Sequence, residues 1–187
     1  INNSKRPIAI AGWGLHLSNT EEDFLSFVNQ LNIPVALTWG ASDVLDVKNP
    51  LYVGTFGTHG QRHANFAVQN ADLIISLGSR LDTKATGSPI STFARDAKKI
   101  VIDIDPNELG KFNIFNLNID ILIQDDLNNF FAEVNPKLKD LVKDRNKKWL
   151  KIINNWKITF TEISILNRRS NNPYYVFKRI SDLLKPN

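Results

Sequence analysis

The chain has 187 residues, 42% of them hydrophobic and 22% charged, which is typical of one globular domain and excludes a disordered or low-complexity protein. It has no Cys and three His, which excludes disulfides, thiolate metal sites and a Cys nucleophile, and it has no run of roughly 18 apolar residues that would span a membrane and no signal-peptide pattern. The net charge of +4 is local, because residues 137–157 carry eight Lys/Arg and two Asp. We therefore expect a soluble, cytoplasmic protein that binds neither nucleic acid nor membrane.

Short β-branched runs alternate with polar, glycine-rich or helical segments along the first two thirds of the chain. This pattern is typical of βα units around a parallel sheet. Most of the runs are apolar without alternation, as expected for strands that are covered on both faces. The expected strands are residues 8–11, 35–37, 73–77, 100–104 and 119–123.

Helical periodicity predicts the segments between and after these strands. Ser18 stands three residues before Glu21 in a capping-box pattern, which predicts a first helix over about residues 20–31. Further helices are expected at residues 63–70 and 127–134. A long helix is expected after Pro136, with an apolar stripe and an outward basic face. The stripe consists of Leu138, Leu141, Val142, Trp149, Ile153 and Trp156.

The first strand runs into Gly12-Trp13-Gly14, which resembles the start of a dinucleotide-binding fingerprint. The third glycine is missing, since Leu17 stands where Gly or Ala is needed, and the helix is expected to begin several residues later. Two interpretations stay open. The glycines either approach a ligand at the carboxyl end of the strand or form a tight turn without one.

Residues 54–60 form the most glycine-dense segment, followed by Arg62 and a helix start. Three glycines permit close backbone approach, so their amides are candidates to bind a phosphate; a solvent-exposed loop is the alternative. His59 has no carboxylate nearby in sequence, so we interpret it as a hydrogen-bonding or loop-ordering residue.

Charged residues follow the next two strands. Arg80 comes just after residues 73–77 and suits a phosphate or an aromatic ring, although a surface pair with Asp82 is the alternative. Asp103 and Asp105 end the strand at 100–104. One of them is expected to accept ribose hydroxyls and the other to cap the next turn, and nothing supports an acid–base pair.

Seven short motifs, taken together in their order along the chain, are more specific than any one of these segments alone. They are Gly12-Trp-Gly, Ile33 to Gly40, Gly57-Thr-His-Gly60 with Ala64-Asn65, Ala71 to Arg80, Phe93-Ala94, Asp103-Ile-Asp-Pro and Glu108-Leu-Gly-Lys111. In this order they resemble the central domain of thiamine-diphosphate-dependent enzymes of the acetolactate synthase type, over about residues 7–131. The resemblance implies an α/β fold with three layers, a Rossmann-like parallel sheet of about six strands with helices on both faces.

The resemblance also implies a cofactor site. Acetolactate synthases carry FAD on this domain without net redox chemistry, whereas other relatives bind ADP there or nothing. Two positions depart from the synthases, Thr58 for the usual Met and Thr83-Lys84 for the usual Asp-Arg. The implied contacts are Gly12, Gly14, Leu37, Thr38, Trp39, Gly40, Thr58, His59, Gly60, Gly78, Arg80, Asp103, Ile104 and Asp125.

We expect residues 1–165 to form this central domain, and residues 166–187 to form a linker and the first helix of a diphosphate-binding domain. The chain begins with Ile1, contains no Met and has no Gly-Asp-Gly magnesium motif, so we expect a fragment without catalytic residues. Thiamine diphosphate and Mg²⁺ would belong to the full-length parent, which would decarboxylate a 2-oxo acid and transfer the aldehyde. Its expected partners are its own pyrimidine and diphosphate domains in a homo-oligomer. The alternatives are a related decarboxylase or lyase with an ADP-type or vacant site, and a non-catalytic nucleotide-binding module.

Overall fold

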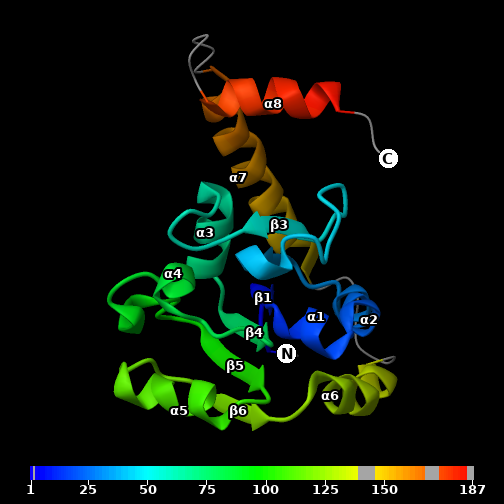
Figure 1. Cartoon of the computed structure of the whole chain (residues 1–187), viewed down its shortest axis with the longest axis vertical. Helices are drawn as coiled ribbons and strands as arrows, with labels where there is room; N and C mark the ends of the chain where they lie inside the picture. The colour runs from blue at the N-terminus through cyan, green and yellow to red at the C-terminus, as the bar shows by residue number, and fades with distance from the viewer. Residues whose placement is uncertain (2, 139–145, 167–172, 185–187) are drawn as a thin grey trace.

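The computed structural model describes residues 1, 3–138, 146–166 and 173–184, without the side chains of residues 161–166, 174 and 178. A six-stranded sheet, parallel throughout, lies at its centre, with the strand order β3-β2-β1-β4-β5-β6 (Figure 1). The three-layer Rossmann-like fold expected from the sequence is therefore confirmed. The strands are β1 (Pro7–Ala11), β2 (Val35–Leu37), β3 (Tyr52–Thr55), β4 (Leu73–Leu77), β5 (Lys98–Asp103) and β6 (Ile121–Gln124).

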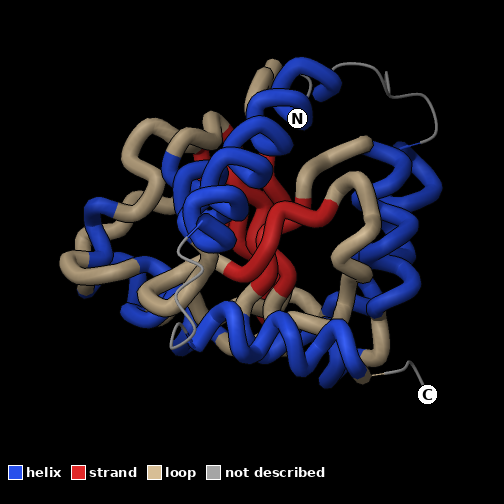
Figure 2. The backbone as a smooth tube through the Cα atoms, turned by 90° about the horizontal axis from the view of Figure 1, so that it is seen from above, coloured by secondary structure: helices blue, strands red, loops and turns tan. Residues whose placement is uncertain are grey.

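Helices cover both faces of this sheet, and Figure 2 shows them around the strands. Successive strand residues point to opposite faces, so Ile8 and Ile10 join one hydrophobic cluster while Ala9 and Ala11 join the other. The first cluster lies under α3 (Arg62–Gln69), α5 (Pro106–Ile114) and α7 (Lys147–Leu166). The second lies under α1 (Gly14–Ser18), α2 (Glu21–Leu31), α6 (Leu127–Val134) and the 3₁₀ turn η3 (Asn135–Leu138).

The structure differs from the sequence expectations in several elements. β3 was not expected, and it takes Gly54 and Thr55 out of the predicted glycine-rich loop. The helix predicted over residues 20–31 is confirmed as α2, but the short helix α1, which was not expected, precedes it from Gly14. The capping box is also absent, since Thr20 is the N-cap of α2 without a side-chain bond and the Ser18 hydroxyl donates back to the carbonyl of Gly14.

The short helix α4 (Thr83–Thr86) follows β4 and is capped by Asp82. Asp105 caps α5 in the same way, through the Asn107 amide. The remaining 3₁₀ turns are η1 (Trp39–Ala41) and η2 (Ile90–Thr92).

The predicted long helix begins differently from the expectation. The segment starts as η3, and α7 runs from Lys147; Leu141 and Val142 lie outside the described residues. Of the predicted stripe, Trp149 and Ile153 are buried in the first cluster, and Trp156 packs against it. Leu138 is buried in the second cluster, on the other face of the sheet, so it does not share their stripe. Lys157 does not belong to the outward basic face, because its ammonium lies 4.7 Å from the centre of the Tyr52 ring.

The last helix, α8 (Pro173–Leu183), lies at the end of α7 that is away from the sheet (Figure 1). The predicted linker at residues 167–172 lies outside the described residues. Within the described part of the chain, no helix is long and apolar enough to cross a membrane.

Candidate functional site

The strand order reverses between β1 and β4, and two pockets lie at the carboxyl ends of the strands there. Open α/β sheets bind ligands at such a switch point. Trp13, Gly78 and Arg80 line both pockets. The smaller one, of about 270 Å³, extends over β2 and is called the aromatic pocket. The larger one, of about 550 Å³, extends over β5 and β6 and is called the acidic pocket.

Three glycines bring the ends of β1 and β4 together between these pockets. The Gly14 amide donates to the Gly78 carbonyl at 2.9 Å, and a Cβ on Gly14 would lie 2.6 Å from the Gly78 Cα. A Cβ on Gly12 would overlap the Gly78 carbonyl as well, and Gly78 itself has a φ of +59°. These positions therefore require glycine because the two backbone segments pack closely against each other. The packed segments form the base of the site.

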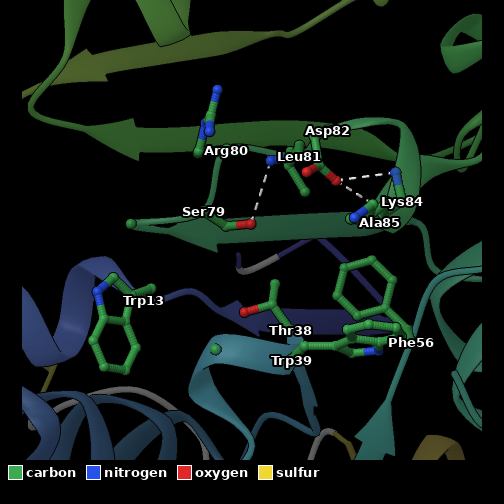
Figure 3. Close-up of a pocket in the computed structure, with 12 residues that line it drawn as sticks. Trp13, Thr38, Trp39, Phe56, Ser79, Arg80, Leu81, Asp82, Lys84 and Ala85 are labelled. Carbon is green, nitrogen blue, oxygen red and sulfur yellow. Dashed lines mark hydrogen bonds between the residues drawn. The ribbon is translucent and has the colours of Figure 1, made fainter. Parts of the chain in front are cut away.

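The aromatic pocket combines two exposed indoles with two cations. Trp13 and Trp39 are 53% and 54% exposed, and in Figure 3 their rings lie to either side of Thr38. The Thr38 hydroxyl donates to the Ala11 carbonyl at 3.0 Å, which fixes the start of η1 over β1. Arg80 and Lys84 line the other wall. Planar aromatic groups and anions both find partners in such a pocket.

The acidic pocket is lined by five carboxylates. Asp105 and Asp126 cap α5 and α6, so their side chains are held by helix amides. Asp103 at the end of β5 is 9% exposed and accepts a bond from the Asp105 amide at 3.0 Å. Burial raises the pKa of Asp103 above its ordinary value. The remaining carboxylates are Glu108 and Asp125.

Asp105 caps the next helix, as predicted for one of the two aspartates. Asp103, the last residue of β5, lines the acidic pocket, and its binding of ribose hydroxyls stays a prediction. Ile104 lies outside the strand, is 63% exposed and lines the same pocket. Its position shows that β5 ends one residue earlier than expected.

Arg80 does not form the surface pair with Asp82 that the sequence left open. Its Nε donates to Glu108 at 2.9 Å, and Lys111 bonds to both Glu108 and the Arg80 carbonyl. The Arg80 side chain remains 73% exposed, and in Figure 3 it extends away from Thr38 and Trp39. Its charge is therefore held at the boundary of the two pockets and is accessible from solvent.

The glycine-rich loop does not offer the expected row of free amides. The Gly57 amide donates to the Asn65 side chain, the Thr58 amide to the Lys84 carbonyl and the Gly60 amide to the Gly57 carbonyl. The amide interpretation is wrong for these three groups. The His59 ring packs against Trp39 at a tilt, with 5.2 Å between ring centres, in agreement with a loop-ordering role.

Most of the predicted site residues meet at this edge of the sheet. Gly14, Thr38, Trp39, Gly40, Gly78, Arg80, Asp103, Ile104 and Asp125 line the two pockets. Thr58 and His59 line two separate pockets beside them. Gly12, Leu37 and Gly60 line none of these four pockets, and Leu37 is fully buried in the core.

Sequence reasoning missed further residues that line the pockets, among them Trp13, Leu17, Lys84 and Glu108. Trp13 stands between two predicted glycines, so its position alone was a usable signal. Lys84 and Glu108 follow strand ends, where ligand-binding residues gather. Leu17 was considered only as a departure from the fingerprint, but it lines the acidic pocket.

A comparison with protein-family models identifies the family of this chain. Residues 1–134 match the model described as the thiamine pyrophosphate enzyme, central domain. The chain belongs to this family. The match includes all six strands and both pockets, and it confirms the resemblance that the motifs carried.

Curated relatives are similar over most of the chain. A probable acetolactate synthase large subunit of Methanococcus aeolicus is 37% identical over 166 residues, which cover 84% of this chain and 27% of that protein. The acetolactate synthase large subunit of Cyanidium caldarium is 36% identical over 82% of this chain and 26% of its own length. That of Lactococcus lactis is 35% identical over 77% and 26%. The chain thus spans about a quarter of the relatives it matches.

Proposed function

We propose that this chain is the central domain of an acetolactate synthase-like thiamine-diphosphate enzyme and that its switch-point pockets bind a nucleotide of the FAD or ADP class. The observation that carries the proposal is the pair of pockets around Trp13, Gly78 and Arg80 at the β1–β4 reversal. The acidic pocket falls within the roughly 300–1,000 Å³ common for small-molecule sites.

The charges of the two pockets suit different parts of a nucleotide. Carboxylates accept hydrogen bonds from hydroxyls and repel phosphates, so the acidic pocket suits a ribose, held by Asp103 and Asp125. A diphosphate is favoured beside Arg80 and Lys84, which are the cations of the aromatic pocket. The indoles of Trp13 and Trp39 then offer faces to an aromatic ring. FAD would supply a flavin there, which relatives of this type use without net redox chemistry.

An ADP-type site in a related decarboxylase or lyase is the second candidate. Thr58 and Lys84 stand where the synthases usually have other residues, and the glycine-rich loop uses three amides within the protein. These features remove contacts from the side of the site that a flavin would need. The third candidate is a non-catalytic nucleotide-binding module. It would bind the nucleotide with the same affinity, but the adjoining coding sequence would not encode the other domains of an enzyme.

The whole enzyme belongs to the proposal as well. The parent would hold thiamine diphosphate and Mg²⁺ between a pyrimidine and a diphosphate domain of a cytoplasmic homo-oligomer, and would decarboxylate a 2-oxo acid for carboligation in branched-chain amino acid biosynthesis. Residues 1–165 would be its central domain and α8 the start of the next one, so this chain alone would be inactive. A Gly-Asp-Gly motif in the adjoining coding sequence tests this assignment.

Isothermal calorimetry with FAD and with ADP tests the pocket. Arg80→Ala should weaken nucleotide binding by about 1–3 kcal/mol, because charge-assisted hydrogen bonds are lost. Arg95→Ala, which removes an exposed charge outside both pockets, should leave affinity unchanged. Tryptophan fluorescence should change on binding, because Trp13 and Trp39 line the site. No heat with either nucleotide in folded protein would refute the site.

A further inference from the structure

His16 in α1 lies between two carboxylates from other parts of the chain. Its Nδ1 is 2.5 Å from an oxygen of Glu21, in the first turn of α2, and its Nε2 is 3.0 Å from an oxygen of Asp43, after η1. The sequence analysis did not identify this cluster, because His16 and Asp43 are 27 positions apart.

This geometry favours the protonated ring. An ionised carboxylate only accepts hydrogen bonds, so a bond to each of the two carboxylates requires two ring N–H groups, which only the imidazolium carries. Burial lowers the pKa of His16, but the hydrogen bonds to Asp43 and Glu21 outweigh this effect and hold the pKa above its ordinary value. The hydrogen bond from His16 in turn lowers the pKa of Asp43.

The imidazolium contacts the tryptophan that the two pockets share. The ring centres of His16 and Trp13 are 4.7 Å apart, a distance at which a cation is attracted to an indole face. On another side, the Trp13 Cβ would lie 3.2 Å from a Cβ on Gly40. Trp13 is therefore held between α1 and the start of η1, while half of its surface stays open to the pockets.

We propose that His16 is a positioning residue of the nucleotide site. As an imidazolium, it donates hydrogen bonds to both Glu21 and Asp43 and holds the Trp13 indole at the boundary of the aromatic and acidic pockets. The inference rests on the proposed function where it concerns nucleotide affinity. The hold on Trp13 itself does not depend on any ligand.

Loss of the ring proton would undo this arrangement. A neutral imidazole has one N–H for two carboxylates, so one carboxylate would face a lone pair. The other charged groups on the elements packed against α1 are also acidic, namely Glu22 and Asp23 on α2 and Asp125 and Asp126 at the start of α6. None of them opposes the imidazolium, whose pKa is raised by Asp43 and Glu21. We expect Trp13 to loosen as the pH rises through the pKa of His16.

The first experiment needs no ligand. NMR of the ring protons should give a His16 titration midpoint above about 6.5, the ordinary value. Glu21→Gln should lower this midpoint, whereas Glu22→Gln, which removes the same charge from an exposed neighbour, should change it little. The fluorescence of Trp13, obtained as the difference from Trp13→Phe, should titrate with the same midpoint. A midpoint at or below 6.5, equal effects of the two Gln variants, or a Trp13 signal independent of pH would overturn the proposal.

The second experiment measures ADP affinity from pH 6 to 9 by calorimetry. It should fall by about two- to fivefold across the His16 midpoint, the size expected for loss of one cation–π contact at an exposed site. His16→Gln should remove that step and retain only the titration of ADP itself. A step that persists in His16→Gln would overturn the role in binding. If ADP and FAD bind at no pH, the proposed function fails while the ligand-free experiment still decides whether His16 positions Trp13.

Discussion

At the scale of single residues, the glycines at the switch point serve the fold before they serve a ligand. Gly14 and Gly78 place two backbones closer together than any side chain permits. Gly110 is the opposite case, because it lies inside α5 and a Cβ there would meet nothing within 4 Å. Glycine is therefore needed at Gly14 because the backbones approach closely, whereas at Gly110 it contributes only flexibility.

Gly14→Ala should destabilise the protein by about 1–3 kcal/mol, since the new methyl group forces a backbone shift. Gly110→Ala should instead stabilise it by about 0.5–1 kcal/mol, because alanine loses less entropy in a helix. Urea unfolding of both variants measures these changes. Equal effects of the two substitutions would show that the β1–β4 approach is not tight.

His63 on α3 is a second residue whose protonation matters, and it acts in the opposite direction to His16. It is 5% exposed, and burial together with the charge of Lys157 lowers its pKa below the ordinary value. The unfolded chain therefore binds a proton more readily than the folded one. Such a group costs stability as the pH falls below about 6.5, until the lower folded pKa is reached.

The free energy of unfolding of the wild type should therefore fall, relative to that of His63→Leu, between pH 7.5 and 5.5. Comparing the two proteins cancels the titration of His16 and Asp103, which both contain. Urea unfolding at several pH values gives the difference. A difference that is constant with pH would show that His63 titrates equally in both states.

At the scale of elements, the sequence predicts those parts whose pattern is strong and local. β1, β2 and β4 are continuous apolar runs, and α2 and α6 have clear stripes, so their bounds are right to within a residue or so. β3 was missed because Tyr52–Thr55 contains a glycine and little apolar sequence; its pairing with β2 makes it a strand. α1 was missed because five residues carry too little periodicity.

The candidate site follows the same division. Residues at strand ends, such as Arg80 and Asp103, can be predicted from the parallel topology alone. Partners brought from elsewhere cannot, and Glu108 beside Arg80 or Asp43 beside His16 are examples. The family motifs add residues that the local pattern does not distinguish, including Leu37, which the structure buries in the core.

Trp149 is a main anchor of α7 on the sheet. Trp149 is 2% exposed, donates to the Pro7 carbonyl at 3.1 Å and packs edge-on against Trp156. Trp149→Ala should cost about 3–5 kcal/mol. Trp149→Phe, which keeps most of the apolar volume, should cost less, and Ile152→Ala on the exposed side of α7 should change stability little. Thermal or urea unfolding measures all three, and a tolerated Trp149→Ala would mean that α7 docks through other contacts.

At the scale of the whole molecule, the sheet and its covering helices share the hydrophobic core of the described chain, and the helix α8 contributes nothing to it. Both hydrophobic clusters draw on the sheet and its covering helices, and neither includes a residue of α8. The described side chains of α8 are exposed, with Phe177 at 71% and Leu183 at 75%. An isolated helix of 11 residues is marginal in water, because packing supplies most helical stability in proteins.

The amides of α8 should therefore exchange much faster than those of β5, which form the sheet ladder between β4 and β6. The shorter α6 is the matched control, since Leu127 and Phe131 anchor it in the core and should slow its exchange. A chain ending at Leu166 should accordingly unfold with the same free energy as the full chain. Hydrogen exchange followed by mass spectrometry, together with urea unfolding of the shortened chain, tests both statements. Protection of α8 equal to that of β5, or a loss of stability on removing it, would place α8 within the same cooperative unit as the sheet.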